Sequence, residues 1–180
     1  MTVKRGNSGK SKEARKPFKV ASLFGRRWEA QFDERELSSD AGLAALVSSG
    51  IADGLLANLA AALDDPRKGT VHSTVQLLRQ RTFLILGGYY DANDSNHLRD
   101  DSVMRTAAGK ALEEGGLASQ PTISRLEGSV SKKDLLRMAR ALCDDYLDSF
   151  EGKAPTMICI DMDPSAHLVY GQQQLGLFNT

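Results

Sequence analysis

The stretch Thr156-Met-Ile-Cys-Ile-Asp161-Met-Asp163 differs in pattern from the rest of the chain. It is a short apolar run, rich in residues that favour β-structure, which follows Pro155 and ends in two acids spaced i, i+2. Alternate residues of a strand point to the same face, so this spacing predicts a buried strand that presents both carboxylates on one side. Acids at the end of a buried strand are common metal ligands. The alternative is that Asp161 and Asp163 only end the strand and begin a turn at Pro164.

Helical patterns fill most of the residues before this strand. Apolar side chains recur at helical spacing between turn-forming residues, which predicts helices near 38–50, 53–65, 71–90, 98–112, 117–127 and 131–150. Ser131 and Asp134 resemble a capping box at the start of the last helix. The short apolar segments 18–24 and 28–32 instead predict a hairpin or two short strands. The expected fold is therefore mainly α (α+β), with a short N-terminal β element and one strand near residues 156–163.

The charge of the chain is unevenly distributed along the sequence. The formal net charge is +0, but residues 1–19 are strongly basic and contain Glu13 as their single acid. Glycine and serine are frequent in the same segment, which cannot build a core, so residues 1–17 are predicted to form a disordered arm. Its charge suits a polyanion such as DNA, and a solubilising tail is the alternative.

The sequence carries no signal for a membrane or a disulfide. No apolar run approaches the ~20 residues of a membrane-spanning helix, and the N-terminus lacks the apolar segment of a signal peptide. These features predict a cytoplasmic protein that does not enter a membrane. Cys143 and Cys159 do not have the spacing of zinc ligands, so we expect both to be reduced residues of the core.

The segment Leu117-Ala-Ser-Gln-Pro-Thr-Ile-Ser-Arg-Leu-Glu127 has the pattern of a recognition helix. Pro121 suits a first turn, and Ile123 and Leu126 are predicted to point inward. The polar residues left outward near the N-terminus are Gln120, Thr122, Ser124 and Arg125. In a helix-turn-helix unit, here spanning residues 106–127, such side chains reach base edges and phosphates. The alternative is an ordinary capped surface helix, since the glycine usual in the turn lies one place off, at Gly116.

Further cations and amides lie outside the apolar faces of the neighbouring helices. On the 71–90 helix the polar residues are Gln76, Arg79, Gln80 and Arg81, and the 131–150 helix begins with Lys132 and Lys133. We expect Arg79, Arg81, Lys132 and Lys133 to contact DNA phosphates. The alternative for all of them is a solvated helix face.

Several longer motifs occur in a characteristic order. They are Leu77-Leu-Arg-Gln-Arg81, Gly88-Tyr-Tyr-Asp-Ala-Asn-Asp94, Leu98-Arg-Asp100, the 117–127 segment, Asp161-Met-Asp163 and Tyr170-Gly-Gln-Gln173. Together they resemble the N-terminal part of bacterial insertion-sequence transposases of the thirteen-eighty family, also described as group 1 transposases with a DDE catalytic domain. The resemblance covers about residues 18–179, which leaves only the basic arm outside it.

The resemblance implies two regions and a site. Residues 18–150 would form a mostly helical DNA-binding region, and residues 155–180 would begin a ribonuclease-H-like catalytic domain. In this chemistry three carboxylates hold two divalent cations, here Mg²⁺, which activate the attacking oxygen and stabilise the leaving one. Asp163 is the expected catalytic and metal-binding acid, with Asp161 as the alternative. The implied partner is DNA, in the form of the terminal inverted repeats, in the bacterial nucleoid. The implied protein partners are a second copy or an intact transposase.

The chain departs from the family after Asp163. Family members continue with further strands, a second Asp and a final Glu, whereas this sequence stops at Thr180. One strand with one or two carboxylates cannot organise two metal ions. We therefore expect an N-terminal fragment with a truncated ribonuclease-H-like domain, which does not catalyse transposition, does not bind Mg²⁺ stably and at most binds DNA. The alternatives are a competitor of an intact transposase and a stand-alone helix-turn-helix regulator.

Overall fold

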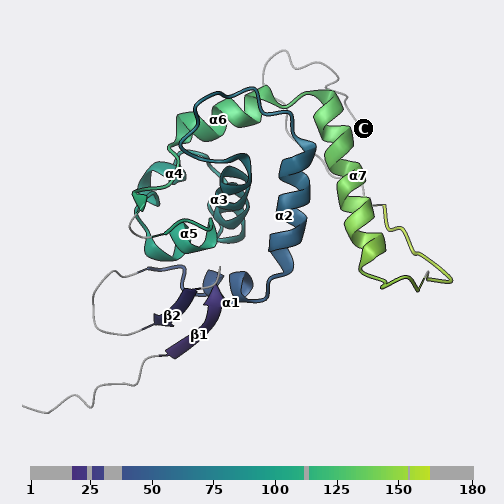
Figure 1. Ribbon diagram of the computed structural model, residues 1–180, viewed down its shortest axis with the longest axis horizontal. Coiled ribbons are helices and arrows are strands. Elements are labelled where there is room, and N and C mark those ends of the chain that lie inside the picture. The colour runs from purple at the N-terminus through teal and green to yellow at the C-terminus, as the bar shows by residue number, and fades with distance from the viewer. Residues whose placement is uncertain (1–17, 24–25, 31–37, 112–113, 154, 163–180) are drawn as a thin grey trace, which may run out of the picture.

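The computed structural model describes residues 18–23, 26–30, 38–111, 114–153 and 155–162, and most of them are helical (Figure 1). The helices are α1 (Leu43–Ser48), α2 (Ile51–Ala62), α3 (Thr74–Leu86), α4 (Asp94–His97), α5 (Ser102–Ala107), α6 (Gln120–Ser129) and α7 (Lys132–Asp148). Two strands, β1 (Phe18–Leu23) and β2 (Arg26–Ala30), pair antiparallel, with Phe18 opposite Ala30. The mainly helical fold expected from the sequence is confirmed. None of the described helices has the length and apolar character needed to cross a membrane.

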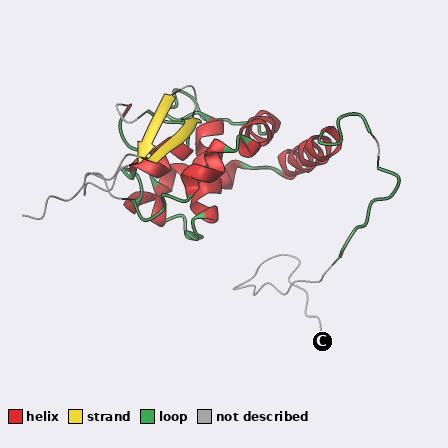
Figure 2. Cartoon of the chain, turned by 90° about the horizontal axis from the view of Figure 1, so that it is seen from below, coloured by secondary structure: helices red, strands yellow, loops and turns green. Residues whose placement is uncertain are grey.

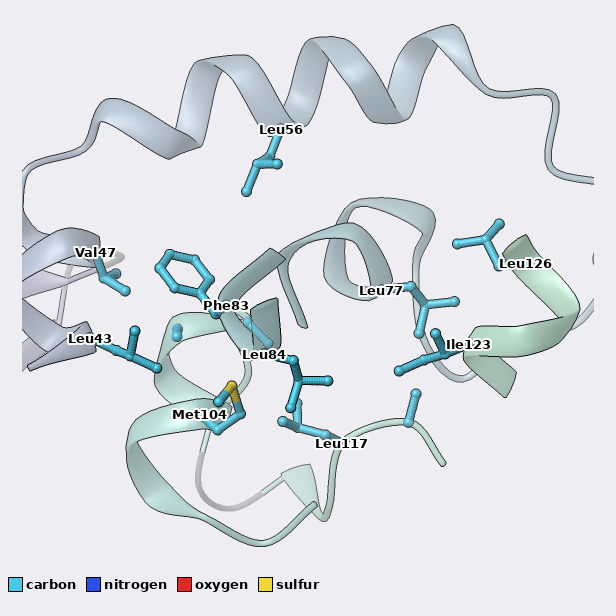
Figure 3. Packing of buried hydrophobic residues seen from close by; sticks show 13 residues of the cluster. Leu43, Val47, Leu56, Leu77, Phe83, Leu84, Met104, Leu117, Ile123 and Leu126 are labelled. Carbon is cyan, nitrogen blue, oxygen red and sulfur yellow. The ribbon is translucent and has the colours of Figure 1, made fainter. Parts of the chain in front are cut away.

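The hydrophobic core is organised around α3. This helix contributes Leu77, Phe83 and Leu84, which are at most 2% exposed. Figure 3 shows these side chains packed with residues of α1, α2, α5 and α6 and of the segment before α6, which are Leu43, Val47, Leu56, Met104, Leu117, Ile123 and Leu126. Burial of one such side chain contributes about 1.5–3 kcal/mol to folding. The core therefore joins α3 to α1, α2, α5 and α6.

The boundaries of α3 differ from the predicted helix at 71–90. The helix begins at Thr74 because Ser73 accepts a hydrogen bond from the Gln76 N–H, and the Gln76 side chain accepts one from the Ser73 N–H. It ends at Leu86, and Gly88 follows with φ +90°, a backbone conformation that glycine adopts without strain. The apolar pattern of the sequence continues past these residues, so periodicity alone overestimated the length of the helix.

A buried glutamine of α3 holds the segment in front of α6. Gln80 is 2% exposed, and its Nε2 donates to the Ala118 carbonyl at 2.9 Å. In return, the Ala118 N–H donates to Gln80 Oε1 at 3.0 Å. The expectation that Gln80 faces solvent is therefore wrong. A polar side chain can be buried here because it satisfies both backbone groups of Ala118.

The junction of α2 and α7 is built around Asp134. The capping box predicted at Ser131 is confirmed, because Asp134 accepts from the Ser131 N–H at 2.8 Å and the Asp134 N–H donates to Ser131 Oγ at 3.2 Å. Asp134 Oδ1 also accepts from the Asp64 N–H, just beyond the end of α2, and from Arg137. Arg137 Nε donates to the Ala62 carbonyl at 2.8 Å. The Asp134–Arg137 pair thus provides hydrogen-bond partners for backbone groups at the beginning of α7 and at the end of α2.

This junction predicts a loss of stability in acid. The hydrogen bonds from Ser131 are the main reason that the pKa of Asp134 lies below its usual value. A carboxyl group with a lowered pKa in the folded state stabilises the protein fully above its unfolded-state pKa, and the contribution disappears as the pH falls through the folded-state pKa. We expect the free energy of unfolding to fall below about pH 4, and to fall less in the Asp134→Asn variant. Thermal unfolding of both proteins across this pH range measures the difference, and equal acid sensitivity would contradict the assignment.

The strand predicted near 156–163 is not formed over residues 156–162, which run as a loop (Figure 2). Met157, Ile160 and Met162 are 77–86% exposed. A strand forms only when its backbone N–H and C=O groups find partners on a neighbouring strand, and no such partner lies beside it among the described residues. The rest of the predicted segment from Asp163 to residue 180, and the predicted basic arm at 1–17, lie outside the described residues.

Two smaller expectations are also corrected. Cys143 and Cys159 are exposed, so neither is a core residue. The single helix expected at 98–112 is limited to α5, where Asp101 caps the first turn through Met104 N–H at 2.8 Å. Gly109, with φ +74°, follows the end of that helix, and the short α4 precedes it. These breaks arise from capping and left-handed glycine, which an apolar pattern does not report.

Candidate nucleic-acid interface

The sequence predicts that the polar face of α6 contacts DNA. The opposite, apolar face of this helix packs on the hydrophobic core. Ile123 and Leu126 are 1% and 4% exposed and insert into the core, as predicted (Figure 3). Pro121 occupies the first turn. The opposite side of the helix carries the polar residues, because helical spacing turns neighbouring positions away from the buried pair.

The N-terminus of α6 is fixed by two contacts from the α4–α5 region. Asn96 Oδ1 accepts a hydrogen bond from the Gln120 N–H at 3.0 Å, and so satisfies one of the amides that begin the helix. Arg99 Nε donates to the Leu117 carbonyl at 3.0 Å, while the Leu117 N–H donates to the Arg99 carbonyl at 2.9 Å. Sequence reasoning missed both contacts. For Asn96, the cluster of turn formers at 91–96 was a signal, because a polar side chain in such a segment is available to cap another element.

The predicted recognition residues lie together on α6. Gln120 Nε2 donates to Ser124 Oγ at 2.9 Å, one turn further along the helix. Arg125 is exposed, and its Nε and Nη2 donate to the Pro121 carbonyl at 3.0 Å and to Thr122 Oγ1 at 3.5 Å. The arrangement is a row of donors and acceptors that bond mainly to one another. Because these partners are local and partly exposed, they can be exchanged for a ligand at modest cost.

The predicted phosphate-binding cations fall into two groups. Lys132 and Lys133 are exposed in the first turn of α7, and only Val130 and Ser131 separate that helix from α6. Arg81, in contrast, joins α3 to α6 through an ion pair of 2.8 Å between its Nε and Glu127 Oε1.

The Arg81 Nη2 also donates to the Tyr90 carbonyl at 3.0 Å. A phosphate contact by Arg81 would therefore have to replace a contact that holds α6 in place. Arg79 is half-buried on α3.

The acids proposed as metal ligands do not form a centre among the described residues. Asp161 is exposed in the loop that follows α7, and Asp163 lies outside the described residues. In the part of the chain that the structure describes, no group of three or more His, Cys, Asp or Glu side chains could hold a metal ion. Mg²⁺ binds through oxygen ligands at near-octahedral geometry, and one exposed carboxylate does not fit that requirement.

Comparison with protein families decides the class of protein. The family model described as "Transposase DDE domain group 1" matches residues 20–180. The chain belongs to this transposase family. No curated protein and no solved structure matches it. DDE transposases act on DNA, so the family implies DNA as a partner of this chain. Members of the family typically use a divalent metal ion.

The transposase chain differs from a compact helix-turn-helix unit within the segment 106–127. Helix α5 ends at Ala107 and α6 begins at Gln120, so residues 108–119 connect them. The turn of such a unit has about three or four residues. A lysine side chain links two described parts of this longer connection. Lys110 Nζ donates to the Gly116 carbonyl at 2.7 Å, and burial lowers the pKa of this lysine.

Proposed function

We propose that this chain is the DNA-binding part of an insertion-sequence transposase of the thirteen-eighty type, and that α6 contacts the terminal inverted repeats. The observation that carries the proposal is the position of α6. Its apolar side is anchored by Ile123 and Leu126, and its polar side presents Arg125 to solvent. A helix that is rigidly seated and polar outward is the element that reads a groove in most helical DNA-binding proteins.

The chemistry of the exposed residues fits DNA. The Arg125 guanidinium carries five donors and remains charged, so after it releases Pro121 and Thr122 it can bond a guanine edge or a phosphate. Gln120 and Ser124 present an amide and a hydroxyl that are suited to base edges or phosphates. Lys132 and Lys133 add charge for phosphates just beyond the end of α6.

The proposal predicts a specific loss of affinity in Arg125→Ala. Binding to terminal-repeat DNA should weaken by about 1–3 kcal/mol if Arg125 reads a base. Fluorescence anisotropy with terminal-repeat and scrambled duplexes, at several salt concentrations, measures this loss. Lys153→Ala is the matched control, because Lys153 is an exposed cation beyond α7. Unchanged affinity in Arg125→Ala would show that α6 is a packing helix. Equal losses on both duplexes would limit Arg125 to a phosphate contact.

We propose further that a polypeptide of residues 1–180, assayed by itself, binds DNA without cutting it. The reaction of this family needs three carboxylates around two cations, and the resemblance assigns Asp163, or alternatively Asp161, to only the first of these positions. We expect no strand cleavage of donor-end DNA with Mg²⁺ or Mn²⁺ on a denaturing gel. Metal-dependent nicking that disappears in Asp163→Ala would overturn this proposal and leave the binding proposal intact.

A further inference from the structure

Helix α7 presents a broad apolar surface that no described element covers. The helix lies beside α2 at the edge of the described structure (Figure 1). Five large apolar side chains of this helix are 48–57% exposed. We call them the outer face of α7: Leu135, Leu136, Leu142, Tyr146 and Leu147. Apolar groups this large, gathered on one helix, mark an interaction surface more often than scattered exposed residues do.

The outer face also continues into the body of the protein. Leu135 and Met138 line a shallow apolar groove of about 250 Å³ with residues of α3 and α6. At the other end, the rings of Tyr146 and Phe150 pack edge to face with their centroids 5.0 Å apart. The apolar surface therefore extends from Leu135 to Phe150, with Leu142 and Cys143 near its middle.

The charged residues of α7 are arranged in the order that its helix dipole disfavours, with basic residues toward the N-terminus and acidic residues toward the C-terminus. The N-terminal half carries the exposed cations Lys132, Lys133 and Arg140, and the C-terminal half carries Asp144, Asp145 and Asp148. Arg137 also lies in the N-terminal half, but it is bonded to Asp134 and to the Ala62 carbonyl. A helix dipole favours acids near the N-terminus and bases near the C-terminus, so this order is unfavourable for α7 alone, apart from the capping Asp134. The same order is self-complementary when two such helices run antiparallel, because the basic half of each then faces the acidic half of the other.

We propose that α7 is a dimerisation helix, which pairs antiparallel with α7 of a second copy of this chain about a two-fold axis near Leu142 and Cys143. A two-fold interface uses the same surface on both copies, so its apolar stripe must be centred on the axis. The outer face meets this condition. The pairing places Arg140 of one copy near Asp144 of the other. It does not depend on the function proposed for α6.

The first experiment measures self-association of the full chain by sedimentation over a range of concentrations. We expect a reversible dimer, and in Leu142→Asp a dissociation constant raised about tenfold or more, since a charge then lies at the centre of the interface. Leu86→Asp is the matched control, because Leu86 is a similarly exposed leucine on α3 and should leave the dimer unchanged. A wild-type chain that stays monomeric, or a Leu142→Asp dimer as tight as wild type, would overturn the proposal.

The second experiment tests the direction of the helices. Arg140→Asp should weaken the dimer, and the double variant Arg140→Asp/Asp144→Arg should restore it, because the swapped charges again face each other in the antiparallel pair. In a parallel pair, position 140 faces position 140 and the swap restores nothing, which would contradict the proposed geometry. Circular dichroism and thermal midpoints of each variant establish that the fold itself is retained.

Cys143 supplies a probe of the axis. It is exposed, and in a Cys159→Ser background it is the only thiol of the chain. A short bismaleimide reagent should join two copies through Cys143 into a dimer band on a denaturing gel, and Cys143→Ser should abolish that band. Absence of the band from a chain that sediments as a dimer would place the interface elsewhere.

Discussion

Replacement of Gln80 by Met should be one of the most destabilising single changes in this protein. Methionine has nearly the same shape, so the variant leaves little cavity, but it removes the two hydrogen bonds to Ala118. The N–H and C=O of Ala118 are then buried without partners, since that residue is 0% exposed. Each unsatisfied group costs about 1–3 kcal/mol, so we expect the free energy of unfolding to fall by about 2–6 kcal/mol.

Urea denaturation measures this loss, and Leu78→Met on the same helix is the control. That change conserves volume and removes no hydrogen bond, so its cost should stay below about 1.5 kcal/mol. Because Ala118 lies directly before α6, Gln80→Met should also weaken terminal-repeat binding, at temperatures where the variant is still folded. Equal stability of the two variants would mean that water enters to satisfy Ala118.

The second large effect is expected for Phe83→Ala. Phe83 is a residue of α3, is 2% exposed, and lies in the core on the side that faces α1 and α2 (Figure 3). Removal of a buried phenyl ring loses its transfer free energy and leaves a cavity, which together cost about 3–5 kcal/mol. We expect a loss of this size in the free energy of unfolding.

Ile85 provides the comparison for Phe83 within one helix. It is 42% exposed, so Ile85→Ala should cost less than about 1.5 kcal/mol. Urea denaturation of both variants tests the arrangement of the core, because a similar cost for the two would mean that Phe83 is not enclosed as described. The slope of the unfolding free energy against urea concentration should be the same in wild type and in both variants. An unchanged slope shows that the substitutions alter stability and not the compactness of the native or denatured state.

The elements that were predicted well are those whose signals are local. Pro121 in a first turn and the Ser131–Asp134 capping box act within one turn of helix, and the structure contains α6 and α7 at these positions. The inward positions of Ile123 and Leu126 follow from spacing along the same helix. The candidate recognition residues are their neighbours, so the sequence also placed them together on one side.

The elements that were predicted poorly depend on partners far away in the chain. An apolar run such as 156–162 becomes a strand only beside another strand, and none of the described residues provides one. Gln80 and Arg81 are residue types usual on a solvent-exposed helix face. In the structure, Gln80 bonds to Ala118 and Arg81 bonds to Glu127. No pattern within α3 indicates which of its polar residues meets a distant segment.

The sequence by itself determined the class of this protein and the helices that matter to it. Its ordered motifs indicate a DDE transposase, which the family match over residues 20–180 confirms, and its capping and spacing signals locate α6 and α7. Only the tertiary structure decided that Gln80 supports α6, that Asp134 and Arg137 join α7 to α2, and that the outer face of α7 stays uncovered by described residues. The reason is that helix signals act over a few neighbouring residues, whereas burial and hydrogen-bond partnership are properties of segments that meet only in the folded chain.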